Sequence, residues 1–194
     1  MPRNPFRRAV EVPSEVRGQA QLGKGEKILA GTRAADGTWL LGTPDALLLV
    51  EPSPMSFGRS QSVEPGGGLS NRSVETRIPW QRVEKADWDR EAERLTLAEV
   101  GEFGQVRPEY AFEIADPGLL LELIRERVTS SVVLQRRVVV SGKAGLFVVA
   151  RRPPRGDGEI TWAYEFDPGV SPEDPAVIEA ARRGLETATE ELGL

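Results

Sequence analysis

Short segments of alternating or wholly apolar residues occupy the chain between positions 27 and 114. They cover residues 27–33, 38–41, 46–50, 76–80, 81–88, 93–100 and 109–114. In the last of these, Tyr110, Phe112 and Ile114 fall on one face of an extended strand. Asp36-Gly37 lies between the first two segments and is typical of a tight hairpin turn. The pattern predicts a series of antiparallel strands.

The apolar spacing changes from that of a strand to that of a helix at residues 116–128. Asp116 suits the N-cap and Pro117 the first helical position. Leu120, Ile124 and Val128 then fall on one stripe. We therefore expect an α+β fold in which this helix closes one end of an antiparallel β-roll or barrel over residues 26–129.

Residues 130–194 have a second pattern of strands followed by a helix. Segments 132–140 and 146–152 predict a hairpin around 141–145, and residues 159–166 alternate clearly. A last helix should follow Pro175, with an apolar stripe of Val177, Ala181, Leu185, Ala188 and Leu192. We expect a three-stranded antiparallel unit covered by a C-terminal helix, either separate from the first sheet or continuing it.

Two segments show no sustained period. Residues 1–25 hold several prolines and arginines and predict a flexible N-terminal arm. Residues 51–75 are rich in Pro, Ser and Gly, including Gly66-Gly67-Gly68, and predict a disordered loop that could also act as a lid. A role of the arm in contacting a partner is the alternative.

Composition narrows the possible chemistry. The chain of 194 residues has no Cys and no His, which excludes thiolate chemistry, Ser–His–Asp triads and the usual transition-metal ligands. The net charge of −5 argues against a surface built to coat nucleic acid. No apolar run approaches the roughly 18 residues needed to span a bilayer, and no signal peptide is evident. We expect a cytoplasmic protein with no cofactor.

The order of elements in residues 26–129 resembles a known family. The strands, then Ile78-Pro79-Trp80-Gln81-Arg82-Val83, then Arg94-Leu95-Thr96-Leu97, then Tyr110-Ala111-Phe112-Glu113-Ile114 and a closing helix are similar to a bacterial pleckstrin-homology-like domain. The resemblance implies a bent antiparallel barrel capped by a helix, in a module that binds proteins, peptides or phosphoinositides and is seldom catalytic. Members that bind phosphoinositides carry a basic cluster on the first hairpin loop, but residues 34–37 here read Ala-Ala-Asp-Gly. Arginine far outnumbers lysine, as in a GC-rich genome such as that of an actinobacterium.

A basic hairpin is the strongest electrostatic feature of the sequence. No acid lies between Gln135 and Gly156, and strand pairing should bring arginines at the far ends of the hairpin together. Guanidinium groups suit phosphate or carboxylate ligands because each can bind two oxygens at once. The alternative is that these residues pair with acids of the last helix. The candidate ligand-binding residues are Arg136, Arg137, Lys143, Arg151, Arg152 and Arg155.

The other motifs in the sequence give weaker evidence for a binding site. Asp87, Asp89, Glu91 and Glu93 alternate, but Ala92 and Ala98 stand where an EF-hand loop needs Gly and Glu, so a solvated turn is favoured over a metal site. We expect a non-catalytic binding or scaffolding protein with an unknown protein partner. The alternatives are an anionic-ligand site (phosphate, lipid headgroup or nucleic acid) on the basic hairpin, peripheral membrane contact through it, and a carboxylate-dependent enzyme.

Overall fold

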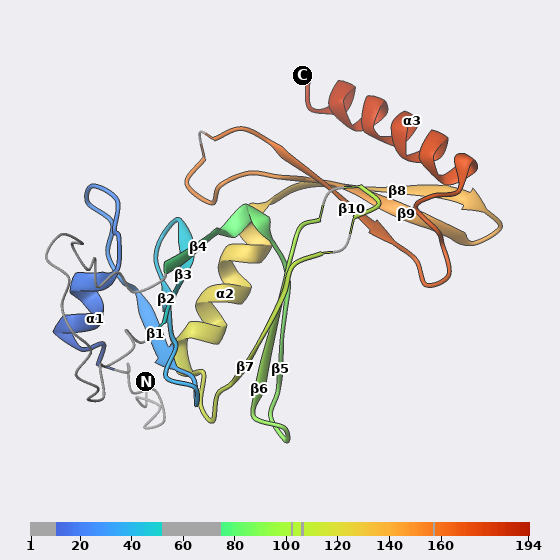
Figure 1. The fold of residues 1–194 in the computed structure, drawn as a ribbon. Coiled ribbons are helices and arrows are strands. Elements are labelled where there is room, and N and C mark those ends of the chain that lie inside the picture. The colour runs from blue at the N-terminus through green and yellow to red at the C-terminus, as the bar shows by residue number, and fades with distance from the viewer. Residues whose placement is uncertain (1–10, 52–74, 102, 106, 157) are drawn as a thin grey trace, which may run out of the picture.

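The computed structural model describes residues 11–51, 75–101, 103–105, 107–156 and 158–194. These residues form three antiparallel sheets accompanied by helices, so the expected α+β class is confirmed (Figure 1). The predicted loop at 51–75 lies almost wholly outside the described residues. No helix in the described part of the chain is long and apolar enough to cross a membrane.

The first sheet contains four strands in the order β1-β2-β3-β4. A tight turn joins β1 to β2, as predicted: the Gly37 N–H donates to the Ala34 carbonyl at 3.0 Å, and Gly37 adopts a φ of 94°. All three pairings in this sheet are antiparallel. The strands are β1 (Ala30–Arg33), β2 (Trp39–Gly42), β3 (Ala46–Val50) and β4 (Glu75–Pro79).

A single turn of 3-10 helix, η1 (Trp80–Arg82), carries the chain from the first sheet into the second. Trp80 is fully buried there, and its indole N–H donates to the Thr43 carbonyl at 2.9 Å. The second sheet has the order β5-β6-β7 and is also antiparallel. Its strands are β5 (Val83–Asp89), β6 (Arg94–Glu99) and β7 (Glu109–Glu113).

Helix α2 (Gly118–Ser131) lies between these two sheets (Figure 1). The N-cap position is occupied by Pro117 and not by Asp116, so the helix begins one residue later than the predicted first helical position and the predicted N-cap is wrong. The Asp116 carboxylate nevertheless accepts a hydrogen bond from the Gly118 N–H at 2.9 Å just before the helix. Apolar residues of both sheets and of α2, including Leu120 and Ile124, form one buried cluster. The expectation of a closed barrel is not confirmed. The described strands within residues 26–129 form two separate open sheets, and α2 packs against strands of both of them.

The N-terminal segment differs from the expected arm. Residues 11–25 include a short helix, α1 (Ser14–Gln19), and bury Val12 and Ala20. These side chains share a cluster with Leu41 and Leu48 of the first sheet. Strand β3 is consequently buried on both faces. The prediction of a free arm is therefore wrong for this part of the segment, because the outer face of β2 and β3 is apolar and these residues cover it.

The third sheet is separate from the other two and has the order β10-β9-β8. Its strands are β8 (Val132–Ser141), β9 (Ala144–Arg151) and β10 (Thr161–Phe166). Helix α3 (Pro175–Glu191) covers one face, packing Val177, Ala181 and Ala188 with Leu146 and Val148. Asp174 caps α3 by accepting from the Ala176 N–H at 2.8 Å. The predicted hairpin, third strand and covering helix are confirmed.

A buried carboxylate, that of Glu26, connects the segment before β1 to the first sheet. Its oxygens accept from the Thr43 hydroxyl at 2.5 Å, from Arg77 at 2.8 Å and from the Gly23 N–H at 2.8 Å. Burial raises the pKa of Glu26, but the hydrogen bonds from Arg77, Thr43 and Gly23 outweigh burial and lower it to about 2. This carboxylate is thus a structural anion.

Both tyrosines are partly buried. The Tyr110 hydroxyl donates to Glu99 at 2.7 Å, and burial together with this carboxylate raises the pKa of Tyr110 to about 12. Burial also raises the pKa of Tyr164. Both phenols are therefore neutral over the physiological pH range.

Candidate functional site

The basic hairpin forms as predicted, but its arginines do not meet at the far end. Arg136 lies opposite Val148 and Arg137 opposite Phe147, in the middle of the β8–β9 ladder. Arg151 lies opposite Val132. The expected meeting of arginines at the strand ends is therefore wrong, because the register places Arg136 and Arg137 several residues away from Arg151 along the hairpin.

Arg136 and Arg137 point to opposite faces of the third sheet, as successive strand residues do. Arg136 pairs with Glu191 of α3 at 2.8 Å, which is the kind of pairing that the alternative interpretation anticipated. Arg137 binds both carboxylate oxygens of Asp167, at 2.8 Å and 2.5 Å, and lies 4.9 Å from the centre of the Phe147 ring. Its hydrogen bonds to Asp167 raise the pKa of Arg137.

Arg151 is 3% exposed and lies where the third sheet meets β5. Its guanidinium donates to the Val83 carbonyl at 3.2 Å and to the Ser131 hydroxyl at 3.3 Å. Glu165 lies 3.6 Å away. Burial lowers the pKa of Arg151, although the carboxylates of Glu165 and Glu84 partly oppose that effect. This arginine joins two parts of the fold and offers almost no surface to a ligand.

The remaining three basic residues are dispersed. Arg155 binds the carboxylate of Asp45 in the first sheet's β2–β3 turn, with one contact of 2.7 Å. The Arg152 backbone N–H donates to the Ser131 carbonyl at 2.7 Å. Lys143 is exposed in the turn between β8 and β9. The six residues thus form no single patch, and ligand binding by them stays a prediction.

The acidic turn at Asp87–Glu93 belongs to the hairpin between β5 and β6. The Asp89 carboxylate accepts from the Glu91 and Ala92 N–H groups, at 2.9 Å and 3.0 Å. Within the described ranges, no group of three or more His, Cys, Asp or Glu residues is arranged to hold a metal ion. The Asp89 side chain serves its own turn, as is common for aspartate at such positions.

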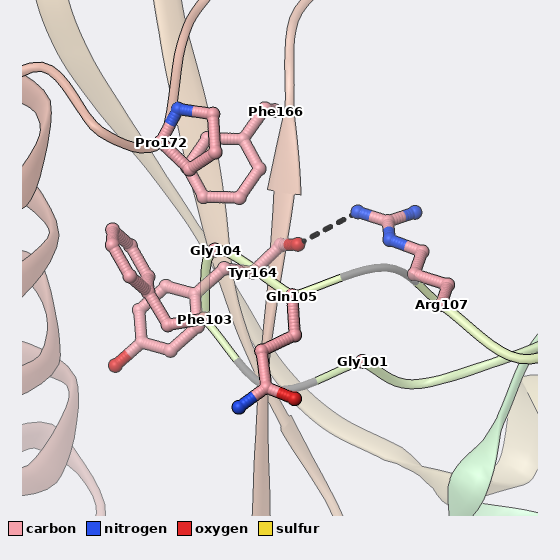
Figure 2. Close-up of a pocket in the computed structure, with 8 residues that line it drawn as sticks. All are labelled: Gly101, Phe103, Gly104, Gln105, Arg107, Tyr164, Phe166 and Pro172. Carbon is pink, nitrogen blue, oxygen red and sulfur yellow. Dashed lines mark hydrogen bonds between the residues drawn. The ribbon is translucent and has the colours of Figure 1, made fainter.

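A small aromatic hollow of about 260 Å³ lies where the chain between β6 and β7 approaches β10 (Figure 2). Phe103 packs edge-on against Tyr164 and Phe166, with ring centres 5.1 Å and 5.5 Å apart. Arg107 donates to the Tyr164 carbonyl at 3.0 Å and also pairs with Glu84. Phe103 lies between the predicted strands at 93–100 and 109–114, and only its aromatic side chain between Gly101 and Gly104 could have drawn attention to it in the sequence.

The strand β8 forms one outer edge of the third sheet, and β10 forms the other. β8 is ten residues long and, among the described strands, pairs only with β9. Val133 and Val139 on it are 41% and 60% exposed. Beside this edge, a groove of about 310 Å³ separates β8 from α3, and its lining includes Arg136, Val138, Val139, Ala180, Arg183 and Gly184.

The fold and these surfaces define an α+β protein with three antiparallel sheets and a long edge strand, β8, that pairs on one side only among the described strands. No family model matches the chain, and comparisons with curated proteins and with solved structures find no significant match.

Proposed function

We propose that this protein is a non-catalytic binding module that adds an extended segment of a partner protein to the outer edge of β8. The observation that carries the proposal is the length of this edge. Ten residues at about 3.3 Å each present roughly 33 Å of strand, with β9 on one side only. Alternate N–H and C=O groups along such an edge point away from the sheet and can pair with another strand.

The composition of β8 supports the same proposal. Soluble proteins usually protect an edge strand with proline, charged residues, β-bulges or a short length. The register of β8 shifts between Val132 and Leu134 and between Val139 and Ser141, so the regular part of its ladder runs from Leu134 to Val139. β8 has the sequence Val-Val-Leu-Gln-Arg-Arg-Val-Val-Val-Ser, which contains neither proline nor lysine and is rich in β-branched residues. Val133 and Val139 lie exposed along it, although burial of a valine side chain is energetically favourable. An arriving strand would cover both the backbone groups and these side chains.

The first two sheets and α2 contribute a second line of support. Four antiparallel strands, then three, then a single helix between the two sheets follow the element order of the pleckstrin-homology-like family. We assign residues 26–129 to that class as part of the proposal, with the sheets open rather than closed. Such modules typically act as adaptors, which fits a protein that works by contact.

The buried carboxylates fit this non-catalytic role. Glu26 accepts hydrogen bonds from Thr43 and Arg77, which hold it as an anion. Glu84 pairs with Arg107, and burial nevertheless raises the pKa of Glu84. Each is committed to a structural arginine, whereas a general acid or base must be free to exchange a proton with substrate.

The proposal is tested by selecting binders from a random dodecapeptide display library against the intact protein. Amide hydrogen exchange then locates the selected peptide, and we expect added protection to be concentrated in Val132–Ser141. Protection confined to another part of the chain, or failure to select any binder, would overturn strand addition at β8.

N-methylation of the selected peptide gives a matched control. Two isomers are made, one methylated at the odd positions and the other at the even positions. An added strand uses only one of its two edges, so one isomer should lose binding and the other should retain it. Equal binding by both isomers would show that side chains alone hold the peptide, which contradicts the proposal.

A further inference from the structure

The groove between β8 and α3 runs beside the edge that the proposed function uses. Its wall on β8 includes Val138 and Val139, and its wall on α3 includes Ala180 and Gly184. Gly184 is essential to the close packing there: a Cβ at this position would lie 2.5 Å from the Val138 side chain. The groove of about 310 Å³ beside this close contact could receive side chains from one face of a strand added to β8.

The charge of this groove is positive. Arg136, Arg137 and Arg183 contribute to its lining, and neither Asp nor Glu does so. Both oxygens of the Asp167 carboxylate already bind Arg137. Arg136 is 39% exposed and pairs with Glu191, which is itself 50% exposed. Arg183 is 67% exposed and lies 3.7 Å from Glu179. Exposed pairs of this kind contribute little free energy, so both guanidinium groups can change partner at small cost.

A second copy of this chain fits the edge poorly. In an antiparallel pairing of two β8 strands about their centres, Arg136 and Arg137 of one strand would face the same residues of the other. Like charges directly opposite one another destabilise a strand pair. A segment that carries acids at the matching positions would instead meet Arg136 and Arg183 with the opposite charge.

We infer that the partner segment is an extended acidic peptide, in which acidic side chains on one face reach Arg136 and Arg183 while small apolar side chains enter the groove between β8 and α3. This inference rests on the proposed function, because it names the chemistry of the segment that β8 accepts. The arginines supply selectivity for charge, and the free edge supplies backbone hydrogen bonds that are independent of side-chain identity.

The test uses three fluorescent decapeptides with one common frame of Val, Thr and Ala. The substituted positions all lie on one face of the extended peptide. They are Glu in the first peptide, Gln in the second and Lys in the third. We expect the Glu peptide to bind about tenfold more tightly than the Gln peptide, with the difference shrinking as salt rises, because two exposed pairs contribute modestly and are screened. The Lys peptide should bind most weakly.

Variants assign the preference to the two arginines. The Arg136→Gln and Arg183→Gln double variant should bind the Glu and Gln peptides equally. Arg182→Gln is the control, because Arg182 is a similarly exposed arginine of the same helix that pairs with Glu179 and Glu186. It should keep the wild-type preference. Circular dichroism and thermal unfolding establish that each variant is folded.

The outcomes separate the two proposals. If the Gln peptide protects β8 from hydrogen exchange and binds as tightly as the Glu peptide, acid selectivity is overturned while strand addition stands. If none of the peptides protects β8, both are overturned. If sedimentation shows a dimer that protects β8 without any peptide, a second copy occupies the edge and the acidic segment is overturned.

Discussion

Replacement of Arg151 by methionine tests whether this residue has a structural role. Methionine retains much of the side-chain length while removing the guanidinium and its charge. The change withdraws the donors to the Val83 and Glu84 carbonyls, at 3.2 Å and 3.4 Å, and to the Ser131 hydroxyl, at 3.3 Å. It also leaves Glu165, 3.6 Å away, without this cation.

The expected cost is about 2 kcal/mol. Hydrogen bonds to a charged group contribute roughly 1.5–3 kcal/mol each, but lengths above about 3.2 Å lie at the weak end of that range. Ser131 keeps another partner, because its hydroxyl donates to the Val128 carbonyl at 2.7 Å. Glu165 is 32% exposed and can be solvated, so the loss should fall below the roughly 3–5 kcal/mol seen when a fully buried ion pair is broken.

The assay is urea-induced unfolding of both proteins, followed by tryptophan fluorescence and circular dichroism. Arg182→Met is the matched control, since Arg182 is 56% exposed on α3 and should change stability by less than about 0.5 kcal/mol. Stability of Arg151→Met equal to or above that of the wild type would refute the reasoning. In that event the cost of burying the charge would outweigh its hydrogen bonds, and the conservation of packing by methionine would be sufficient.

Three further predictions follow from residues already described. Because the pKa of Glu26 is lowered to about 2 from an ordinary value near 4.5, its stabilisation is complete above pH 4.5 and is lost as pH falls towards 2. Acid unfolding of Glu26→Gln should lack that contribution, and an unchanged acid slope would contradict it. Absorbance at 295 nm should show both tyrosines ionising at a higher pH in the folded protein than in the unfolded protein, because the pKa values of Tyr110 and Tyr164 are both raised. Equal titration curves for the two states would count against their burial. Gly184→Ala should lower Tm despite the better helix propensity of alanine, since overpacking costs about 1–3 kcal/mol against a gain of about 1. Gly18→Ala is the control, because a Cβ there meets open space and the Tm should not fall. A higher Tm in Gly184→Ala would show that β8 can shift to accommodate the added methyl group, which contradicts the prediction.

Local patterns in the sequence predicted the individual elements well. The alternation in residues 159–166 became β10, and Leu95 and Leu97 point into the core as expected. The stripe that includes Val177 and Ala181 packs against the third sheet. These predictions succeed because side-chain periodicity follows directly from the geometry of strands and helices.

The division into sheets could not be predicted from such periodicity. Strand β4 ends at Pro79 and β5 begins at Val83, so only the short turn η1 separates strands of different sheets. Nothing in the alternation of apolar residues records which strand pairs with which. The same limitation hid the role of residues 11–25, because Val12 and Ala20 become core residues only once the outer face of β2 and β3 exists.

The candidate site could be predicted only in part, because the partners of its residues lie far away in the sequence. The basic hairpin was visible as a run of charge, but the partners of its arginines lie elsewhere: Asp45 is 110 residues from Arg155, and Asp167 is 30 residues from Arg137. Sequence proximity therefore overstated how much of the cluster is available to a ligand. The sequence predicted the strand at 132–140 but not that it would lie at the edge of its sheet, and the groove beside it depends on how α3 packs on β8.

The contacts between the third sheet and the rest of the molecule have a consequence for folding during translation. Arg151 meets the Val83 carbonyl across 68 residues, and Val100 shares a buried cluster with Val149 and Ala163. The second sheet is complete at Glu113, and at about 5–20 residues per second the first two sheets emerge from the ribosome roughly 2–8 s before Arg151. Throughout that interval a nascent chain exposes Val100 and the carbonyls of β5 to water and to chaperones. The final third of the polypeptide thus covers Val100 and the β5 carbonyls only after the first two thirds have begun to fold.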